Sequence, residues 1–200
     1  PLKDGGLKER ERACINSPDE HASPRVAPLN RPSMDKHLRP ECAEPRSERT
    51  HLVSAIVSTY NAERFIEGCL QDLVDQTLFK KGMLEIVIVN SGSQQNEDAI
   101  IAVFRDRYPE HIVYLKAEEP ESIYQAWNRG IRAARGKYLT NANTDDRHRP
   151  DAFERMISLL EARPEVALVD ADVAITEKEN ETFESSHIVG YLRWPEFSPR

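Results

Sequence analysis

The residues best suited to chemistry lie in one polar run, residues 141–146, which follows the short apolar segment 137–140. The run contains two asparagines and ends in two adjacent aspartates, Asp145 and Asp146. Carboxylate and amide oxygens are the ligands that hard divalent cations prefer, and a charged carboxylate at the end of a buried strand needs a partner. One aspartate could simply cap the helix expected near Pro150, but two aspartates with two asparagines favour a metal or ribose site.

Two further polar clusters offer groups that suit a nucleotide. In residues 59–61, Tyr60 can stack on a base or pack against its own helix. A later cluster begins with Asn90, which can hydrogen-bond along a base edge or close a turn with Gly92. Asp145 can supply hard oxygen to Mg2+ or Mn2+, which would neutralise a diphosphate. The three clusters together favour a nucleotide diphosphate bound through a divalent ion.

Each cluster directly follows a run of residues expected to form a buried strand. The expected strands are residues 52–58, 84–89, 111–116, 137–140 and 165–169, with amphipathic helical stripes between them. Alternating strands and helices predict an α/β domain with a mostly parallel sheet covered by helices on both faces. Ligands bind beyond the carboxyl ends of such strands, where the strand order reverses, so the three clusters are expected to converge there.

Single residues refine the ends of these elements. Asn61 is expected to be the N-cap of the helix after the first strand, and residues 122–125 form a capping box for a later helix. Gly136 is placed where the glycine after a helix C-terminus is expected. Trp127 continues an apolar stripe of the helix before it, so we expect it in the core rather than beneath a sugar ring.

Length, charge and cysteine content limit the classes of protein. The 200 residues suit one domain with a tail, and the formal net charge of -7 argues against a general nucleic-acid partner. The three cysteines are odd in number and lack C-x-x-C spacing, which favours a reducing compartment over a disulfide framework. No apolar run reaches membrane-spanning length and no signal peptide precedes the domain, so the prediction is a cytoplasmic protein without a transmembrane segment.

The first 50 residues differ in composition from the rest. They are rich in Pro, Arg, Glu and Ser and show no apolar period of either kind. Such a segment buries too little apolar surface to offset the entropy of ordering it. We therefore predict a disordered or linker tail over residues 1–50 and one nucleotide-binding domain over residues 51–200.

The order and spacing of the motifs resemble a known family. The chain has no Walker-type phosphate loop, and no GxGxxG follows the first expected strand. The motifs that remain are Ser58-Thr59-Tyr60-Asn61, Asn90-Ser91-Gly92-Ser93, Asn128-Arg129-Gly130 with Ala133, Ala134 and Gly136, and Asn143-Thr144-Asp145-Asp146 with Pro150. Over residues 52–161 they resemble family 2 glycosyltransferases of the GT-A fold. The resemblance implies an enzyme that transfers a sugar from a nucleotide-diphosphate sugar to an acceptor hydroxyl, with a divalent metal and usually with inversion.

The resemblance also assigns roles to particular residues. Thr59, Tyr60 and Glu63 would surround the base, and Asn90 would stand where the family has a base-binding Asp. The implied donor-binding set is Thr59, Tyr60, Asn61, Glu63, Asn90, Gly92, Ser93, Asn128, Asn143 and Thr144. Asp145 and Asp146 would hold Mg2+ or Mn2+. The family's catalytic base lies further downstream, so none is assigned, and the chain is expected to stop before the acceptor half; the acceptor is an unspecified glycan, lipid or protein.

Several alternatives stay open. Asn90 and Asn143 each replace an aspartate of the family pattern, which removes charge and leaves a non-catalytic nucleotide-sugar-binding module as a second interpretation. The segment 170–172 is a literal Asp-x-Asp and competes for the metal. A nucleotide-sugar pyrophosphorylase would need a glycine- and lysine-rich loop after the first strand, and the turn after Tyr60 offers none.

Overall fold

The computed structural model describes residues 14–16, 25–28 and 51–193. The elements are β1 (Cys14–Asn16), β2 (Arg25–Pro28), β3 (His51–Thr59), α1 (Glu63–Asp75), α2 (Thr77–Lys80), β4 (Leu84–Asn90), α3 (Glu97–Arg107), β5 (Ile112–Lys116), α4 (Ile123–Ala133), β6 (Gly136–Asn141), β7 (Asp146–Arg147), α5 (Ala152–Ala162), β8 (Val166–Asp170), β9 (Val173–Thr176) and β10 (Ile188–Leu192). None of the helices in this described part is long and apolar enough to cross a membrane.

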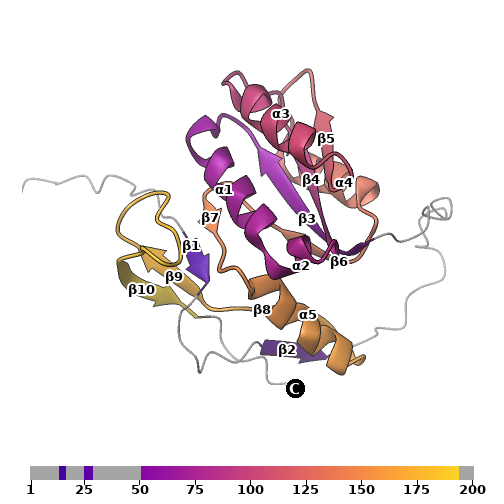
Figure 1. Cartoon of the computed structure of the whole chain (residues 1–200), viewed down its shortest axis with the longest axis vertical. Coiled ribbons are helices and arrows are strands. Elements are labelled where there is room, and N and C mark those ends of the chain that lie inside the picture. Colours follow the sequence, from indigo (N-terminus) through magenta and orange to yellow (C-terminus); the bar gives the residue numbers. More distant parts are fainter. Residues whose placement is uncertain (1–13, 17–24, 29–50, 194–200) are drawn as a thin grey trace, which may run out of the picture.

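A parallel four-stranded sheet forms the centre of the molecule, as the alternating pattern predicts. Its strand order is β5-β4-β3-β6, and every neighbouring pair is parallel. The chain moves outward from β3 through β4 to β5, then crosses back to add β6 on the other side of β3 (Figure 1). Thr59 at the end of β3 is paired with Asn90, and Ile56 is paired with Asn141. The strand order therefore reverses beside β3, where a ligand site is expected.

Helices cover both faces of this sheet, which confirms the predicted fold class. On one face α1 and α3 pack against alternate residues of β3 and β4 (Figure 1). This core includes Val53, Ala55, Val57, Ile66, Leu70, Leu73, Ile86, Ile88, Ile101 and Phe104. Each fully buried aliphatic side chain contributes roughly 1.5–3 kcal/mol of hydrophobic stabilisation. On the opposite face α4 packs closely, because a Cβ at Gly130 would lie 2.5 Å from Ile56 and 3.5 Å from Val89.

Gly136 begins β6 and does not end the preceding helix, so its predicted role is wrong. Helix α4 ends at Ala133, and Ala134 is its C-cap in an extended conformation. A Cβ at Gly136 would lie 2.5 Å from the backbone nitrogen of Ser54. The amide of Gly136 donates to Ser54 Oγ at 2.7 Å and to Glu85 Oε1 at 3.1 Å. Glycine is therefore needed here for the close approach of two strands rather than for a left-handed turn.

The fifth expected strand does form, but outside the parallel sheet. β8 pairs antiparallel with β2 in a separate two-stranded sheet. Another small sheet has the order β10-β9-β1-β7 and lies apart from the central one (Figure 1). Because β1 and β2 fall within residues 1–50, two short segments of the predicted tail pair with the domain. The rest of that prediction lies outside the described residues.

Candidate functional site

The three polar clusters converge on one cleft at the carboxyl ends of β3, β4 and β6, as predicted. The cleft has a volume of about 540 Å³. Its lining residues are Ser58, Thr59, Tyr60, Ser91, Glu121, Ile123, Trp127, Asn143, Thr144 and Asp145. It is large enough for a nucleotide-sized ligand. Of the predicted site residues, the structure thus brings together Thr59, Tyr60, Asn143, Thr144 and Asp145.

Two buried polar atoms of the cleft lining have no hydrogen-bond partner among the residues that the structure describes. One is Oγ1 of Thr59, a residue that is only 1% exposed, and the other is Nε1 of Trp127. Buried polar groups are nearly always satisfied, so unpaired ones at a cleft point to a missing polar ligand or water. Tyr60 beside them is 49% exposed and presents its ring to solvent. The end of β3 and the wall opposite therefore offer two hydrogen-bonding groups and one free aromatic face.

Helix α4 supplies a cleft wall that the sequence interpretation missed. Glu121, Ile123 and Trp127 line the cleft, whereas Trp127 was expected in the core. The side of α4 that is buried against the sheet carries the small residues Ala126 and Gly130. Ile123 and Ile131 of the stripe are exposed, and Trp127 is half-buried at the cleft, so the expectation of a core position for Trp127 is wrong. The signal that could have revealed this is the alanine and glycine at helical spacing, since small residues permit close helix–sheet packing.

The loops after β3 and β4 are joined by hydrogen bonds, and we name residues 61–62 and 92–96 the paired loops. The amide of Asn61 donates to Ser93 Oγ at 2.8 Å, and the amide of Gln94 donates to Asn61 Oδ1 at 3.0 Å. The amide of Ala62 donates to Glu97 Oε1 at 2.7 Å. Asn61 has a φ of 50° and Ala62 is the residue before α1, so the predicted N-cap role of Asn61 is wrong.

Glu63 takes part in the same network from the first turn of α1. Its amide donates to Gln95 Oε1 at 3.1 Å, and its carboxylate accepts from the amide of Asn96 at 3.3 Å. The side chains of Asn61, Glu63 and Ser93 thus bond across the paired loops and do not line the cleft. They shape the loops at the carboxyl end of the sheet, beside the cleft.

Asn90 lies beneath the paired loops and is 1% exposed. Its amide nitrogen donates to Asp98 Oδ1 at 3.1 Å and to the hydroxyl of Tyr114 at 3.0 Å. Its Oδ1 accepts from the amide of Ser93 at 2.8 Å. Both amide hydrogens are therefore used within the protein, and these bonds make Asn90 a support of the loop after β4.

Backbone conformation and limited space both require glycine at Gly92, in the turn after β4. Its φ is +74°, and a Cβ there would lie 2.7 Å from the backbone carbon of Glu119. Asn128, the remaining predicted donor-site residue, is exposed on α4 and lies outside the cleft lining. Neither residue faces the cleft.

The acidic loop, defined as residues 142–151, separates its two aspartates. Asp145 is exposed and lines the cleft. Asp146 accepts a hydrogen bond from Asn143 Nδ2 at 2.9 Å and lines a second cavity of about 470 Å³, which it shares with His148 and Asp170. Burial lowers the pKa of His148 to about 4, so this imidazole is neutral at neutral pH. The two aspartates thus face different cavities.

The cleft fits a cation shared with a diphosphate better than a cation bound by protein alone. No group of three or more His, Cys, Asp or Glu side chains that could hold a metal occurs within the described residues. Glu121, another carboxylate of the cleft, is paired with Arg129 Nη1 at 2.7 Å. Mg2+ keeps several waters and often takes only one or two carboxylates plus substrate phosphates. Asp145 is suited to be that carboxylate.

The competing Asp-x-Asp segment lies outside the cleft. Asp170, at the end of β8, lines the second cavity. Asp172 Oδ2 lies 3.6 Å from Nε of Arg193. Neither aspartate is among the residues that line the cleft with Thr59 and Tyr60. The geometry therefore favours Asp145 over this segment.

Curated proteins similar to this chain include bacterial glycosyltransferases. The "Uncharacterized glycosyltransferase YibD" of Escherichia coli (strain K12) is 34% identical over 137 residues, which cover 68% of this chain and 38% of that protein. The hyaluronan synthase of Pasteurella multocida is 29% identical over 150 residues, which cover 75% of this chain and 14% of that protein. The chain spans well under half the length of these relatives.

A solved structure matches the fold of this chain, and a family model matches most of its sequence. S. aureus TarS 1-349 in complex with UDP superimposes with a TM-score of 0.52 at 22% identity, covering 56% of this chain and 33% of that chain. This likeness concerns the fold, and it confirms the GT-A-like α/β architecture expected from the motifs. The model described as "Glycosyl transferase family 2" matches residues 54–199, which include the whole parallel sheet from Ser54 onward and all three polar clusters. The chain belongs to glycosyl transferase family 2.

Proposed function

We propose that this chain forms the donor-binding part of a glycosyltransferase that takes its sugar from a nucleotide-diphosphate sugar. The observation that carries the proposal is the single cleft in which Thr59, Tyr60 and Asp145 meet at the point where the strand order reverses. The unpaired Thr59 Oγ1 and Trp127 Nε1 supply hydrogen-bonding groups for the ligand. A relative with UDP in its solved complex supports a nucleoside diphosphate as the ligand class.

Different residues of the cleft are suited to bind different parts of the ligand. The exposed ring of Tyr60 can stack on the base, and Thr59 and Trp127 can hydrogen-bond the ribose or sugar. Asp145 would hold Mg2+ or Mn2+, and that ion would neutralise the charge of the leaving diphosphate. We propose transfer to an acceptor hydroxyl with inversion, in keeping with the family resemblance. No catalytic base is assigned, because the family resemblance puts that residue further downstream.

A second function deserves a test because two neutral side chains stand at acidic positions of the family pattern. Asn90 uses both amide hydrogens inside the protein, and Asn143 is bonded to Asp146. A site with fewer charged oxygens holds a free cation weakly. The chain could therefore bind a nucleotide sugar without transferring it.

The test is calorimetric titration with UDP- and GDP-series ligands, with Mn2+ and with a chelator. The parent should bind one series at least about tenfold more tightly with Mn2+, since metal and diphosphate bind cooperatively. Asp145→Asn should abolish this gain, and Asp172→Asn should leave it intact. The reverse pattern would move the site to the Asp-x-Asp segment 170–172. A nucleotide affinity that changes neither with Mn2+ nor with either substitution would favour the non-catalytic module. Absence of any nucleotide binding would refute the proposal.

A further inference from the structure

We propose that α1 holds the acidic loop in position for cation binding through one row of side chains, with Asp72 as the central positioning residue. This inference rests on the proposed function and extends it to residues that neither line the cleft nor belong to its motifs. Cys69 and Asp72 belong to α1, and Gln76 is its C-cap. The three residues lie three and four positions apart and so lie along one side of the helix. All three bond the acidic loop.

The two outer members of the row bond backbone carbonyls of the loop. Cys69 Sγ donates to the carbonyl of Asn143 at 3.6 Å. Burial raises the pKa of this thiol, so it stays protonated and remains a donor. Gln76 Nε2 donates to the carbonyl of Arg149 at 2.7 Å, and Gln76 Oε1 accepts from the amide of Phe153 at 3.3 Å. The loop is thereby fastened at both ends.

Asp72 makes the strongest attachment, in the middle of the row. Its carboxylate accepts from Arg147 Nε at 2.7 Å and Nη2 at 2.6 Å, and from the amide of His148 at 2.9 Å. The side chains of Asp72 and Arg147 are only 13% and 7% exposed. The bonds to Asp72 raise the pKa of Arg147, so the guanidinium stays charged. A bidentate, charge-assisted pair of this kind fixes orientation as well as distance.

Helix α1 also leaves space for the ion pair between Asp72 and Arg147. A Cβ at Gly68 would lie 2.7 Å from Nη1 of Arg147. The same nitrogen donates to the carbonyl of Asn180 at 3.1 Å, which holds the guanidinium from its other side. The glycine within α1 therefore admits Arg147 against the helix backbone.

The attachments flank the two aspartates but leave Asp145 facing the cleft. The loop is held at Asn143 on one side and at Arg147, His148 and Arg149 on the other. A carboxylate carried on a fixed segment loses less freedom when it binds a cation. Partners outside the direct ligands of a metal typically change its affinity 10- to 100-fold when they are removed. Asp72 should therefore set the metal dependence of nucleotide binding without touching the ligand.

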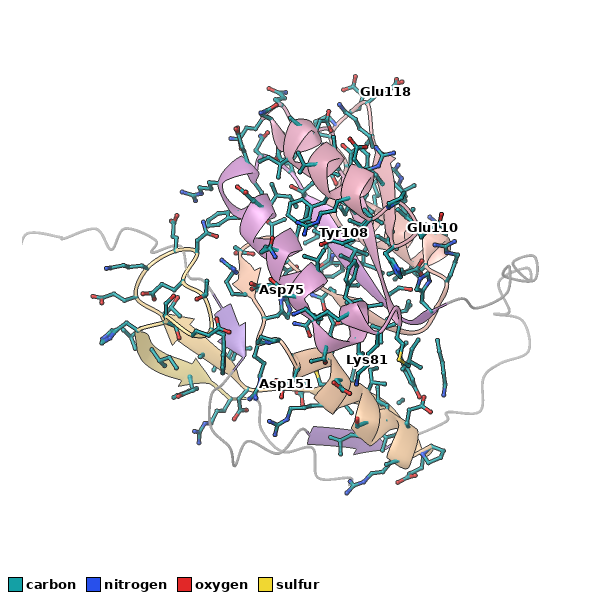
Figure 2. The ribbon with its side chains drawn as sticks, in the orientation of Figure 1. Asp75, Lys81, Tyr108, Glu110, Glu118 and Asp151 are labelled. Carbon is teal, nitrogen blue, oxygen red and sulfur yellow. The ribbon has the colours of Figure 1, made fainter. Side chains whose placement is uncertain are left out.

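The experiment compares Asp72→Asn with Asp75→Asn in the 200-residue chain. Asp75 lies one turn further along α1 (Figure 2), where it is partly exposed and bonds Gln71 and Lys80. The readout is the ratio of nucleotide affinities measured with Mn2+ and with a chelator. Asp72→Asn should lower this ratio about tenfold while the affinity in chelator stays the same. Asp75→Asn removes the same charge from the same helix and should leave the ratio unchanged.

A milder second variant keeps the test decisive if Asp72→Asn folds poorly. Arg147→Lys keeps the positive charge but cannot form the two-pronged pair, so it should lower the ratio by about threefold. A lower thermal midpoint with an unchanged ratio in both variants would show a merely structural role and overturn the inference. If the unsubstituted protein binds the nucleotide equally well with Mn2+ and with a chelator, the proposed metal site is overturned, and this inference with it. A parent with a metal effect that survives both substitutions would overturn this inference alone.

Discussion

The paired loops and the acidic loop both follow strands of the parallel sheet, yet they use their polar side chains differently. In the paired loops, Asn61 and Ser93 bond each other's loops and Glu97 accepts from Ala62. In the acidic loop, the bonds run to α1 through Asp72, and Asp145 is left exposed in the cleft. The polar side chains of the paired loops bond one another, whereas the acidic loop leaves one carboxylate exposed in the cleft.

This difference separates residues that shape a site from residues that touch a ligand. Asparagine, serine and glutamate at a strand end are equally able to bind a nucleotide or to bond a neighbouring loop. Only the partners in the fold distinguish the two uses. The comparison predicts that substitutions in the paired loops change mainly stability, and that substitutions in the cleft change mainly binding.

The largest expected effect is at Gly92, in the paired loops. Gly92→Ala should lower the free energy of unfolding by about 3 kcal/mol, because the residue has a φ of +74° and its Cβ would meet the backbone of Glu119. Urea unfolding measures the change. Gly190→Ala is the matched control, since a Cβ there meets nothing within 4 Å, and it should change stability by less than about 0.5 kcal/mol. Equal losses of unfolding free energy in Gly92→Ala and Gly190→Ala would contradict the special requirement for glycine in the paired loops.

A smaller effect, on binding, is expected at Tyr60. Tyr60→Ala should weaken nucleotide binding about tenfold, or about 1.4 kcal/mol, through loss of stacking on the base. The thermal midpoint should barely move, because the ring is 49% exposed. Tyr191→Ala on β10 removes a comparable ring outside the cleft lining and should not alter affinity. Unchanged affinity for every nucleotide that the parent binds would count against a base at this place.

The smallest effect concerns the acidic loop and pH. The pKa of His148 is lowered to about 4 from an ordinary value of 6.5, so the unfolded chain binds this proton more readily. Stability is full above pH 6.5 and falls as the pH drops towards 4. Between pH 7 and 5.5 this should cost about 1 kcal/mol of unfolding free energy. His148→Asn should flatten the decline, as measured by denaturant unfolding at both pH values. A parallel decline in parent and variant would contradict the assignment.

Local patterns in the sequence were enough to predict the central architecture. The predicted strands β3, β4, β5 and β6 all form. For β3 and β4 the signal is direct, because a strand buried on both faces needs continuous apolar residues whatever lies around it. The capping box at Ser122 and Gln125 is present as predicted, since both its bonds join residues three apart. Convergence of the three polar clusters also follows from alternation alone, because parallel strands share one carboxyl edge.

The tertiary structure decided the features that depend on distant residues. Asn61 and Ser93 are 32 positions apart, and Asp72 and Arg147 are 75 apart, so no local period reveals either attachment. The orientation of α4 was also decided by packing: Gly130 must face the sheet because Ile56 leaves no room for a side chain, and this turns Trp127 towards the cleft. Periodicity determines which elements form. Which side of an element is buried, and which polar group remains free, is set by steric fit and hydrogen-bond partners that exist only once the chain has folded.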